Sequence, residues 1–288
     1  MRVTCFNLCY PCPTLCVIIS AILKEVWILR RIRMVIQYDG TEYVGWQRQP
    51  NGLAVQEVIE NELSKLTGEH VTLYGSGRTD SGVHALSQVA HFDTEVRMPG
   101  EKFCYALNVG LPRDIRILYS EETDPAFHAR FDVQKKSYRY YVLNSTHDSP
   151  FLHRCSNHIH YHLDIDAMQS AAKLFCGEHD FNAFKASGSA VDSTVRTIFA
   201  SEWSKEGELL CYDVTGNGFL YNMVRIMVGT MLEIGLHRCD ESVITSAFGH
   251  CDRTRLGVTA PAKGLFVARV QYSDFDTADF VNRGYRCF

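Results

Sequence analysis

The feature that most constrains the fold of this chain is the order of its predicted secondary-structure elements, because the same order of six elements occurs twice. In the first half, periodic hydrophobic residues predict strand, helix, strand, strand, helix and strand. The first helix is the clearest, since Val55, Ile59 and Leu63 share one face and Gly68 follows its end. The six elements are expected at 33–38, 54–67, 71–74, 86–92, 102–109 and 114–119. This order is the split β-α-β arrangement of ferredoxin-like folds.

The second half repeats this order. A helix is expected between Asp164, a residue type that caps helix N-termini, and Gly177, a type that follows helix ends. The helix expected at 219–235 is apolar on most sides and should therefore be buried. The remaining elements are strands expected at 137–143, 195–203, 209–214 and 265–272. We expect an α+β fold in which the two ferredoxin-like halves form one continuous, mostly antiparallel sheet, with helices on one face and a central cleft.

The expected organisation is an extension, two halves and a tail, spanning residues 1–30, 31–124, 125–272 and 273–288. The extension holds Cys5, Cys9, Cys12 and Cys16. The first three have the spacing of the iron–sulfur motif of radical S-adenosylmethionine enzymes, but nothing in the chain predicts the barrel that carries that motif. The apolar run at 16–23 is too short for a membrane span. We therefore expect a dispensable extension, with no metal site and no membrane association.

The remaining cysteines are scattered singly. Several of them, such as Cys104, Cys176 and Cys211, have apolar neighbours, as buried free thiols do. A disulfide framework is not expected in a chain of 288 residues with this spacing. The cysteines thus predict a reducing, cytoplasmic location.

The net charge of −4 does not by itself suggest a nucleic-acid partner. Residues 34–288 carry 24 basic and 32 acidic side chains, so the overall field repels polyanions. A nucleic acid would have to be bound by a local basic groove. The evidence for such a partner must come from motifs.

The stretch GSGRTDSGVHA at 75–85 places Asp80 among three glycines, with Arg78 two residues before it. Glycine allows a tight turn or the close approach of a ligand, so Asp80 is expected to be exposed and oriented, as a nucleophile or base must be. The alternative is a turn in which Asp80 only caps its own loop.

Two side chains of the second half can complete a site. Arg225 lies in the apolar helix expected at 219–235, and a buried guanidinium needs an anion. Its alternatives are a structural ion pair or an exposed head group. Tyr138 begins the strand at 137–143, where it is either a binding surface or an ordinary cross-strand aromatic residue.

Four sequence blocks, in this order, resemble the tRNA pseudouridine synthase A family. They are YDGTEYVGWQ at 38–47, GRTDSGVHA at 77–85, FHARF at 127–131 with KKSYRY at 135–140, and MVR at 223–225 with TAPAKGL at 259–265. The resemblance covers roughly residues 31–272. It implies a homodimer that needs no cofactor or metal and acts on uridines 38, 39 and 40 in the anticodon arm of tRNA.

The resemblance also implies a role for each candidate residue. Asp80 would be the nucleophile, and Arg225 would pair with it. Arg78 would hold the target nucleotide out of its stack, and Tyr138 would pack on the uracil. Cationic side chains from both halves would bind the RNA phosphates. The candidates are Arg48, Arg130, Lys135, Lys136, Arg139, Lys185 and Arg196.

The chemistry is consistent with these roles. The isomerisation breaks a C–N bond and forms a C–C bond, so it requires no redox agent. Asp80 could attack the ribose C1′ or remove a sugar proton to give a glycal, and the sequence leaves both routes open. A bidentate Arg225 would keep Asp80 ionised. Flipping the base costs a few kcal/mol, of which stacking on Tyr138 would recover about 1–3 kcal/mol.

Two other functions remain open at this stage. One is an RNA-binding protein without catalysis, although a carboxylate would repel the phosphates it binds. The other is a hydrolase or nuclease that uses Asp80 with a metal. No second carboxylate follows Asp80 before Asp93, which argues against a two-carboxylate metal site.

Overall fold

The computed structural model describes residues 29–186, 188, 192–250 and 252–281. The first half contains β1 (Arg30–Tyr38), α2 (Val55–Thr67), β2 (Tyr74–Gly75), β3 (His84–Thr94), α3 (Phe103–Gly110) and β4 (Ile115–Thr123). The second contains β5 (Lys135–Asn144), β6 (Asn157–Ile159), α4 (Ile165–Lys173), β7 (Gly177–Asp180), β8 (Val195–Glu206), β9 (Leu209–Gly216), α5 (Met223–Gly235), α6 (Ser242–His250), β10 (Leu265–Gln271) and α7 (Ala278–Val281). The four clustered cysteines of the extension lie outside the described residues.

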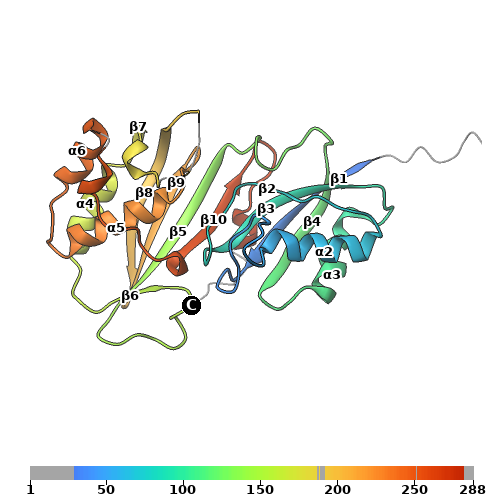
Figure 1. The fold of residues 1–288 in the computed structure, drawn as a ribbon, viewed down its shortest axis with the longest axis horizontal. Coiled ribbons are helices and arrows are strands. Elements are labelled where there is room, and N and C mark those ends of the chain that lie inside the picture. The colour runs from blue at the N-terminus through green and yellow to red at the C-terminus, as the bar shows by residue number, and fades with distance from the viewer. Residues whose placement is uncertain (1–28, 187, 189–191, 251, 282–288) are drawn as a thin grey trace, which may run out of the picture.

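One sheet runs through both halves, in the order β4-β1-β3-β10-β5-β9-β8-β7 (Figure 1). Along this order the neighbouring strands are antiparallel except β3 and β10, which are parallel, with Phe266 opposite His84 and Val267 opposite Ala85. Beside this order, β2 pairs antiparallel with β3, and β6 pairs parallel with β5. Because β10 is the last strand in sequence yet lies at the centre, the end of the chain joins the two halves. The predicted α+β fold is confirmed.

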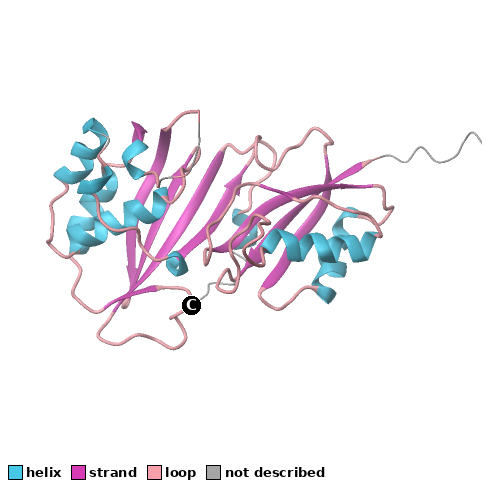
Figure 2. Cartoon of the chain, in the orientation of Figure 1, coloured by secondary structure: helices cyan, strands magenta, loops and turns pink. Residues whose placement is uncertain are grey.

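Each half has its own hydrophobic core. The helices of each half lie against its own part of the sheet (Figure 2). In the first half, Ile59 and Leu63 of α2 pack with Ile32 of β1. In the second, Met227 of α5 packs with strand residues that include Tyr140 and Tyr212. Tyr138 of β5 contacts both cores, so the helices of the two halves cover the same face of the sheet.

Several predicted elements have different bounds in the structure. The helix expected from 219 begins at Met223, because Asn222 has a left-handed backbone with φ of 60°. The helix that Asp164 caps ends at Lys173, and Gly177 instead begins β7. The strand expected at 71–74 is only Tyr74–Gly75, since the backbone N–H of Leu73 donates to the Glu60 carboxylate rather than to a strand.

The sequence patterns did not predict α6, α7, β6 or β7. All four are short, between three and nine residues, and too short for hydrophobic periodicity to be distinctive. In the described part of the chain, no helix combines the length and apolarity that crossing a bilayer requires.

Candidate active site

The loop between β2 and β3, residues 76–83, is fixed by the segment that precedes α2. The backbone N–H of Trp46 donates to the Thr79 carbonyl at 3.2 Å, and the Tyr38 and Thr79 hydroxyls lie 2.8 Å apart. Gly45 has a positive φ of 106°, and a Cβ there would meet the Thr79 carbonyl oxygen at 2.3 Å. A glycine is therefore required where the two segments touch. These contacts fix the backbone that carries Asp80.

Arg225 reaches Asp80 from the other half. It lies in the first turn of α5, and its Nη1 is 3.3 Å from Asp80 Oδ2. The same Nη1 donates to Asn222 Oδ1 at 2.8 Å, and Nε donates to the Ala260 carbonyl at 2.7 Å. The expected bidentate pair is thus a single contact, because Nε and Nη1 also donate to groups of their own half.

The charge on Asp80 is subject to two opposing effects. Burial raises its pKa, whereas the charge of Arg225 and its hydrogen bond lower it, and the net shift is upward from the ordinary aspartate value. The sequence argument expected Arg225 to dominate. Burial outweighs it here because the carboxylate lies at the junction of two packed halves and receives only one hydrogen bond from Arg225. A carboxylate with a raised pKa is a stronger base.

Tyr138 lies beside this pair. Its ring stands edge-on to Phe219, with centroids 5.0 Å apart, and its pKa is raised by burial and by the negative charge of Asp80. In the described structure its hydroxyl makes no hydrogen bond. The phenol is therefore protonated at neutral pH and close enough to sense the carboxylate.

Arg78 is exposed, and its Nε donates to Gln47 Oε1 at 3.2 Å. It makes no ion pair with any described residue and no hydrogen bond to Asp80, Tyr138 or Arg225. The structure thus brings three of the four predicted residues together and places the fourth on the same loop, facing solvent.

Sequence reasoning missed the groups that orient Arg225 and Tyr138. These are the Asn222 side chain, the Ala260 carbonyl and the Phe219 ring. Asn222 and Phe219 lie close to Arg225 in sequence, but the apolar pattern predicts a regular helix that includes both. The carbonyl is 35 residues away and carries no side-chain signal.

Six of the seven candidate phosphate-binding cations, all except Lys185, fall into two groups. Arg139 forms two hydrogen bonds with Asp213, and Arg48 lies 3.6 Å from Glu57, so both have acidic partners. Four others make no ion pair in the described regions: Arg130, Lys135, Lys136 and Arg196. The second group lacks acidic partners, although Lys136 donates to the Ser76 carbonyl and Arg196 to the carbonyls of Ser193 and Val195.

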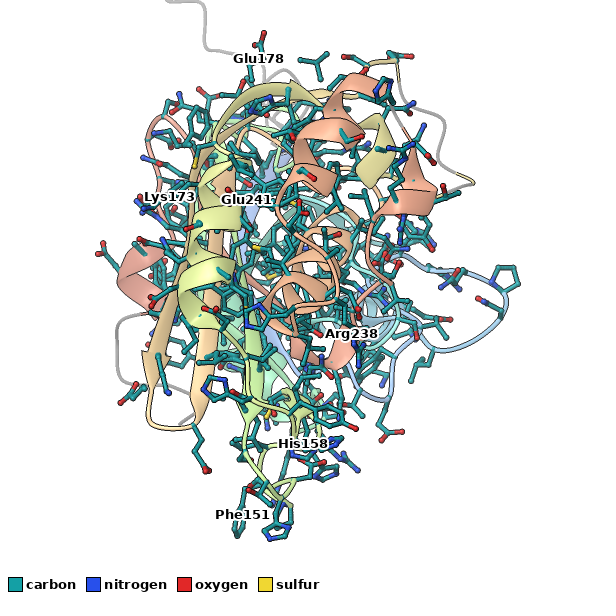
Figure 3. The ribbon with its side chains drawn as sticks, turned by 90° about the vertical axis from the view of Figure 1, so that its left-hand side faces the viewer. Phe151, His158, Lys173, Glu178, Arg238 and Glu241 are labelled. Atoms are coloured by element: carbon teal, nitrogen blue, oxygen red, sulfur yellow. The ribbon has the colours of Figure 1, made fainter. Side chains whose placement is uncertain are left out.

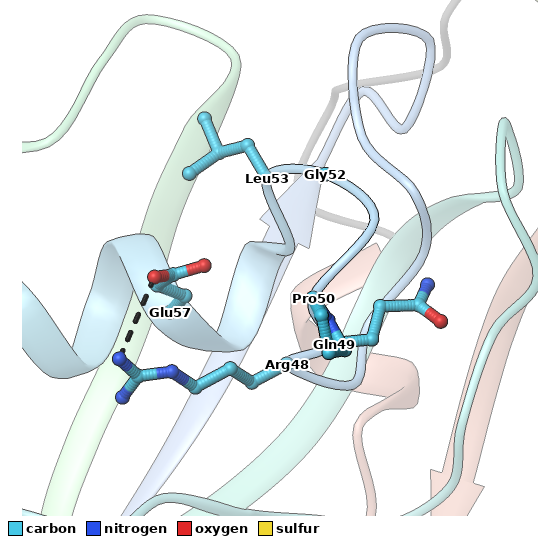
Figure 4. Close-up of a pocket in the computed structure, with 6 residues that line it drawn as sticks. All are labelled: Arg48, Gln49, Pro50, Gly52, Leu53 and Glu57. Atoms are coloured by element: carbon cyan, nitrogen blue, oxygen red, sulfur yellow. Dashed lines mark ion pairs between the residues drawn. The ribbon is translucent and has the colours of Figure 1, made fainter.

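Two surface hollows lie away from Asp80. One, of about 560 Å³, is lined by residues before and within α2, among them Arg48, Pro50 and Glu57 (Figure 4). The other, of about 300 Å³, lies between β6 and α5 and includes His158 and Arg238. No described group of three or more histidine, cysteine, aspartate or glutamate side chains could hold a metal ion.

Comparisons with known proteins show the family of this chain. A family model described as tRNA pseudouridine synthase matches residues 34–132 and 171–273. A tRNA pseudouridine synthase A from Ruminiclostridium cellulolyticum is 50% identical over 245 residues, which cover 85% of this chain and 100% of the relative. Its counterpart from Acetivibrio thermocellus is 46% identical over 244 residues, with the same coverage. A solved archaeal box H/ACA sRNP Nop10–Cbf5 complex overlaps more weakly, with a TM-score of 0.33, 11% identity, and coverage of 70% of this chain and 44% of that one.

Proposed function

The chain belongs to the tRNA pseudouridine synthase family and is an isomerase that acts on tRNA uridines, and we propose that its targets are uridines 38, 39 and 40 of the anticodon stem-loop. The observation that carries the proposal is the contact between Asp80 and Arg225 across the junction of the halves, beside Tyr138. A base flipped out of its stack would enter between these side chains.

In this proposal Asp80 begins the reaction and Tyr138 supports the base. The bond between uracil N1 and ribose C1′ breaks, the base turns, and a bond forms between C5 and C1′. The proton on C5 is lost and N1 gains one, so no electrons are exchanged with another molecule. Asp80 acts either by attack on C1′ or by removal of a sugar proton.

The other two residues would position the substrate and the carboxylate. Arg225 is a positioning residue, because it touches Asp80 and is itself held by Asn222 and Ala260. Arg78 is exposed and has no acidic partner in the described chain, which suits contact with the RNA backbone at the flipped nucleotide.

The decisive experiment compares the natural protein with Asp80→Asn. Each is incubated with unmodified tRNA, with and without a chelator, and pseudouridine is mapped by carbodiimide-dependent stops in primer extension. We expect the natural protein to modify positions 38–40 in both conditions. Asp80→Asn should form no pseudouridine yet bind tRNA within several-fold of the natural affinity, because the amide preserves shape and removes a charge that repels phosphate.

Each rival function predicts a different result. Turnover by Asp80→Asn would refute the assigned nucleophile. Loss of activity in chelator would favour a metal-dependent hydrolase. Tight tRNA binding by the natural protein without any product would favour an RNA-binding protein that has no catalytic role.

We also propose that the protein works as a homodimer in the cytoplasm. Five described cysteines are free thiols, which suits a reducing compartment. The side chain of Phe151 is 89% exposed on a turn tied by hydrogen bonds from Leu152 and His153 to Ser149, and it protrudes from one end of the molecule (Figure 3). We propose that this exposed ring contacts the second copy.

A further inference from the structure

A cluster of aromatic rings lies where the catalytic loop begins. Tyr74 of β2 stacks on His91, with centroids 5.1 Å apart, and His128 stands edge-on to His91 at 4.8 Å. Phe131 lies 4.3 Å from His128. His91 is 1% exposed, whereas Tyr74 is 47% and Phe131 74% exposed. A buried histidine thus supports an exposed aromatic platform, which we define as Tyr74, His128 and Phe131.

The platform is held in place by backbone hydrogen bonds. His91 Nδ1 accepts from the backbone N–H of Ala129 at 3.1 Å. His128 Nδ1 accepts from the N–H of Arg130 at 3.1 Å and from that of Phe131 at 3.4 Å. A surface that is already ordered loses little entropy when it binds a ligand.

Two cations connect the platform to the catalytic loop. The Lys136 ammonium donates to the Ser76 carbonyl, and the Arg130 guanidinium lies 5.7 Å from the Phe131 ring centroid. Burial and the charge of Arg130 lower the pKa of Lys136 to about 8. Neither cation has an acidic partner within the described ranges. Two neighbouring positive charges without an acid favour a bound anion.

The platform is within reach of the same RNA that occupies the active site. Tyr74 precedes Asp80 by six residues, so the two lie at most about 20 Å apart, the length of a fully extended chain of that size. Along one strand of a duplex each nucleotide advances by about 3.4 Å along the helix axis, so this separation corresponds to at most about six nucleotides along the axis. One stem-loop can therefore contact both places.

We propose that the aromatic platform stacks an unpaired nucleotide of the tRNA whose uridine is modified at Asp80, with Arg130 and Lys136 holding the intervening phosphates. This inference rests on the proposed function. It adds a second base-binding site outside the candidate active site. It also predicts which face of the first half the RNA crosses. Aromatic side chains beside unpaired cations are the combination that binds single-stranded RNA.

The test measures the affinity of the full-length protein for unmodified tRNA. Phe131→Ala should weaken binding by about 5- to 150-fold, the range that corresponds to one base stacked on an aromatic ring. Phe131→Trp should restore affinity and Phe131→Leu should not, because stacking needs a π face. Arg130→Gln should reduce the slope of log affinity against log salt by about 0.7–0.9, as the loss of one phosphate contact does.

Tyr105 is the matched control. It is a 70% exposed aromatic residue on α3 whose ring centroid lies 5.7 Å from the Lys102 ammonium, so it has the same local chemistry at another place. Tyr105→Ala should leave tRNA affinity unchanged. Melting temperatures of all variants should match the natural protein, since both rings are exposed.

Abasic sites placed one at a time through the anticodon arm identify the stacked nucleotide. One position should weaken binding to the natural protein but not to Phe131→Ala. The proposal is overturned if no position shows this coupling, if Phe131→Ala binds within about twofold, or if Phe131→Leu restores affinity. Failure of the natural protein to form pseudouridine would refute the proposed function instead, because affinity is measured without turnover.

Discussion

In the proposed reaction Asp80 must be ionised to act, yet it is placed where burial disfavours its charge. Arg225 offsets that effect only in part, because it makes a single 3.3 Å contact and donates its other hydrogen bonds to Asn222 and Ala260. A carboxylate in this position is basic and available for reaction, since it is not tied up in a bidentate pair. This placement destabilises the folded state, because the folded state must hold a charge away from water.

Replacing Arg225 by glutamine should move the pH dependence of the reaction. Burial then acts unopposed, the pKa of Asp80 rises further, and the acidic limb of kcat/KM shifts to higher pH. Because the pKa of Asp80 is raised in the folded state, its ionisation lowers the free energy of unfolding as pH rises. The melting temperature of Arg225→Gln should therefore lie further below that of the natural protein at neutral pH than at acidic pH. Arg225→Lys keeps the charge and serves as the control. An unmoved acidic limb in Arg225→Gln would show that Arg225 does not tune Asp80.

The helix that carries Arg225 is positioned by a glycine one turn further along, on the same face of the helix. A Cβ on Gly229 of α5 would lie 1.7 Å from the Val258 carbonyl oxygen, so the segment at 257–260 can rest on α5 only where no side chain intervenes. This contact also places the Ala260 carbonyl, which accepts from Arg225. One close approach thus sets both the packing of the helix and the orientation of the guanidinium.

Gly229→Ala should therefore destabilise the protein although alanine is the better helix former. Helix propensity alone favours alanine by about 1 kcal/mol, but a methyl group here collides with backbone that cannot rotate away. Activity should fall as well, because the Ala260 carbonyl must move. Gly249 of α6 is the matched control, since a Cβ there meets nothing within 4 Å and Gly249→Ala should be neutral or stabilising. Urea denaturation compares the two, and equal effects would contradict this account.

The two halves share one sheet, because β10 pairs with β5 over six positions and with β3 over two. The β3 pairs, at His84 and Ala85, begin four residues after Asp80. The junction between the two halves is therefore also the place where the candidate active site forms. Asp80 comes from one side of this junction, and Tyr138 and Arg225 from the other.

A charge at Phe151 should separate the proposed homodimer. Phe151→Asp places a carboxylate on the protruding turn and should yield monomers, measured by sedimentation equilibrium, at concentrations where the natural protein is dimeric. Val109→Asp is the control, since Val109 is 88% exposed on α3 in the other half and should not affect assembly. A dimer that survives Phe151→Asp, or dissociates with Val109→Asp, would place the interface elsewhere.

The sequence by itself determined the local features of this protein. Hydrophobic periodicity and caps predicted α2, α4 and most strands, because these depend on neighbours along the chain. The glycines around Asp80 predicted its loop between two strands for the same reason. The four sequence blocks predicted the family to which the chain belongs.

Only the tertiary structure decided what surrounds Asp80. Its partner Arg225 is 145 residues away, and the pairing depends on β10 bringing the halves together. The left-handed Asn222, the single rather than bidentate contact and the upward shift of the Asp80 pKa all follow from how the two cores pack. The strength of an interaction between charges depends on their distance and on the solvent excluded around them. Neither quantity can be predicted from the order of residues alone.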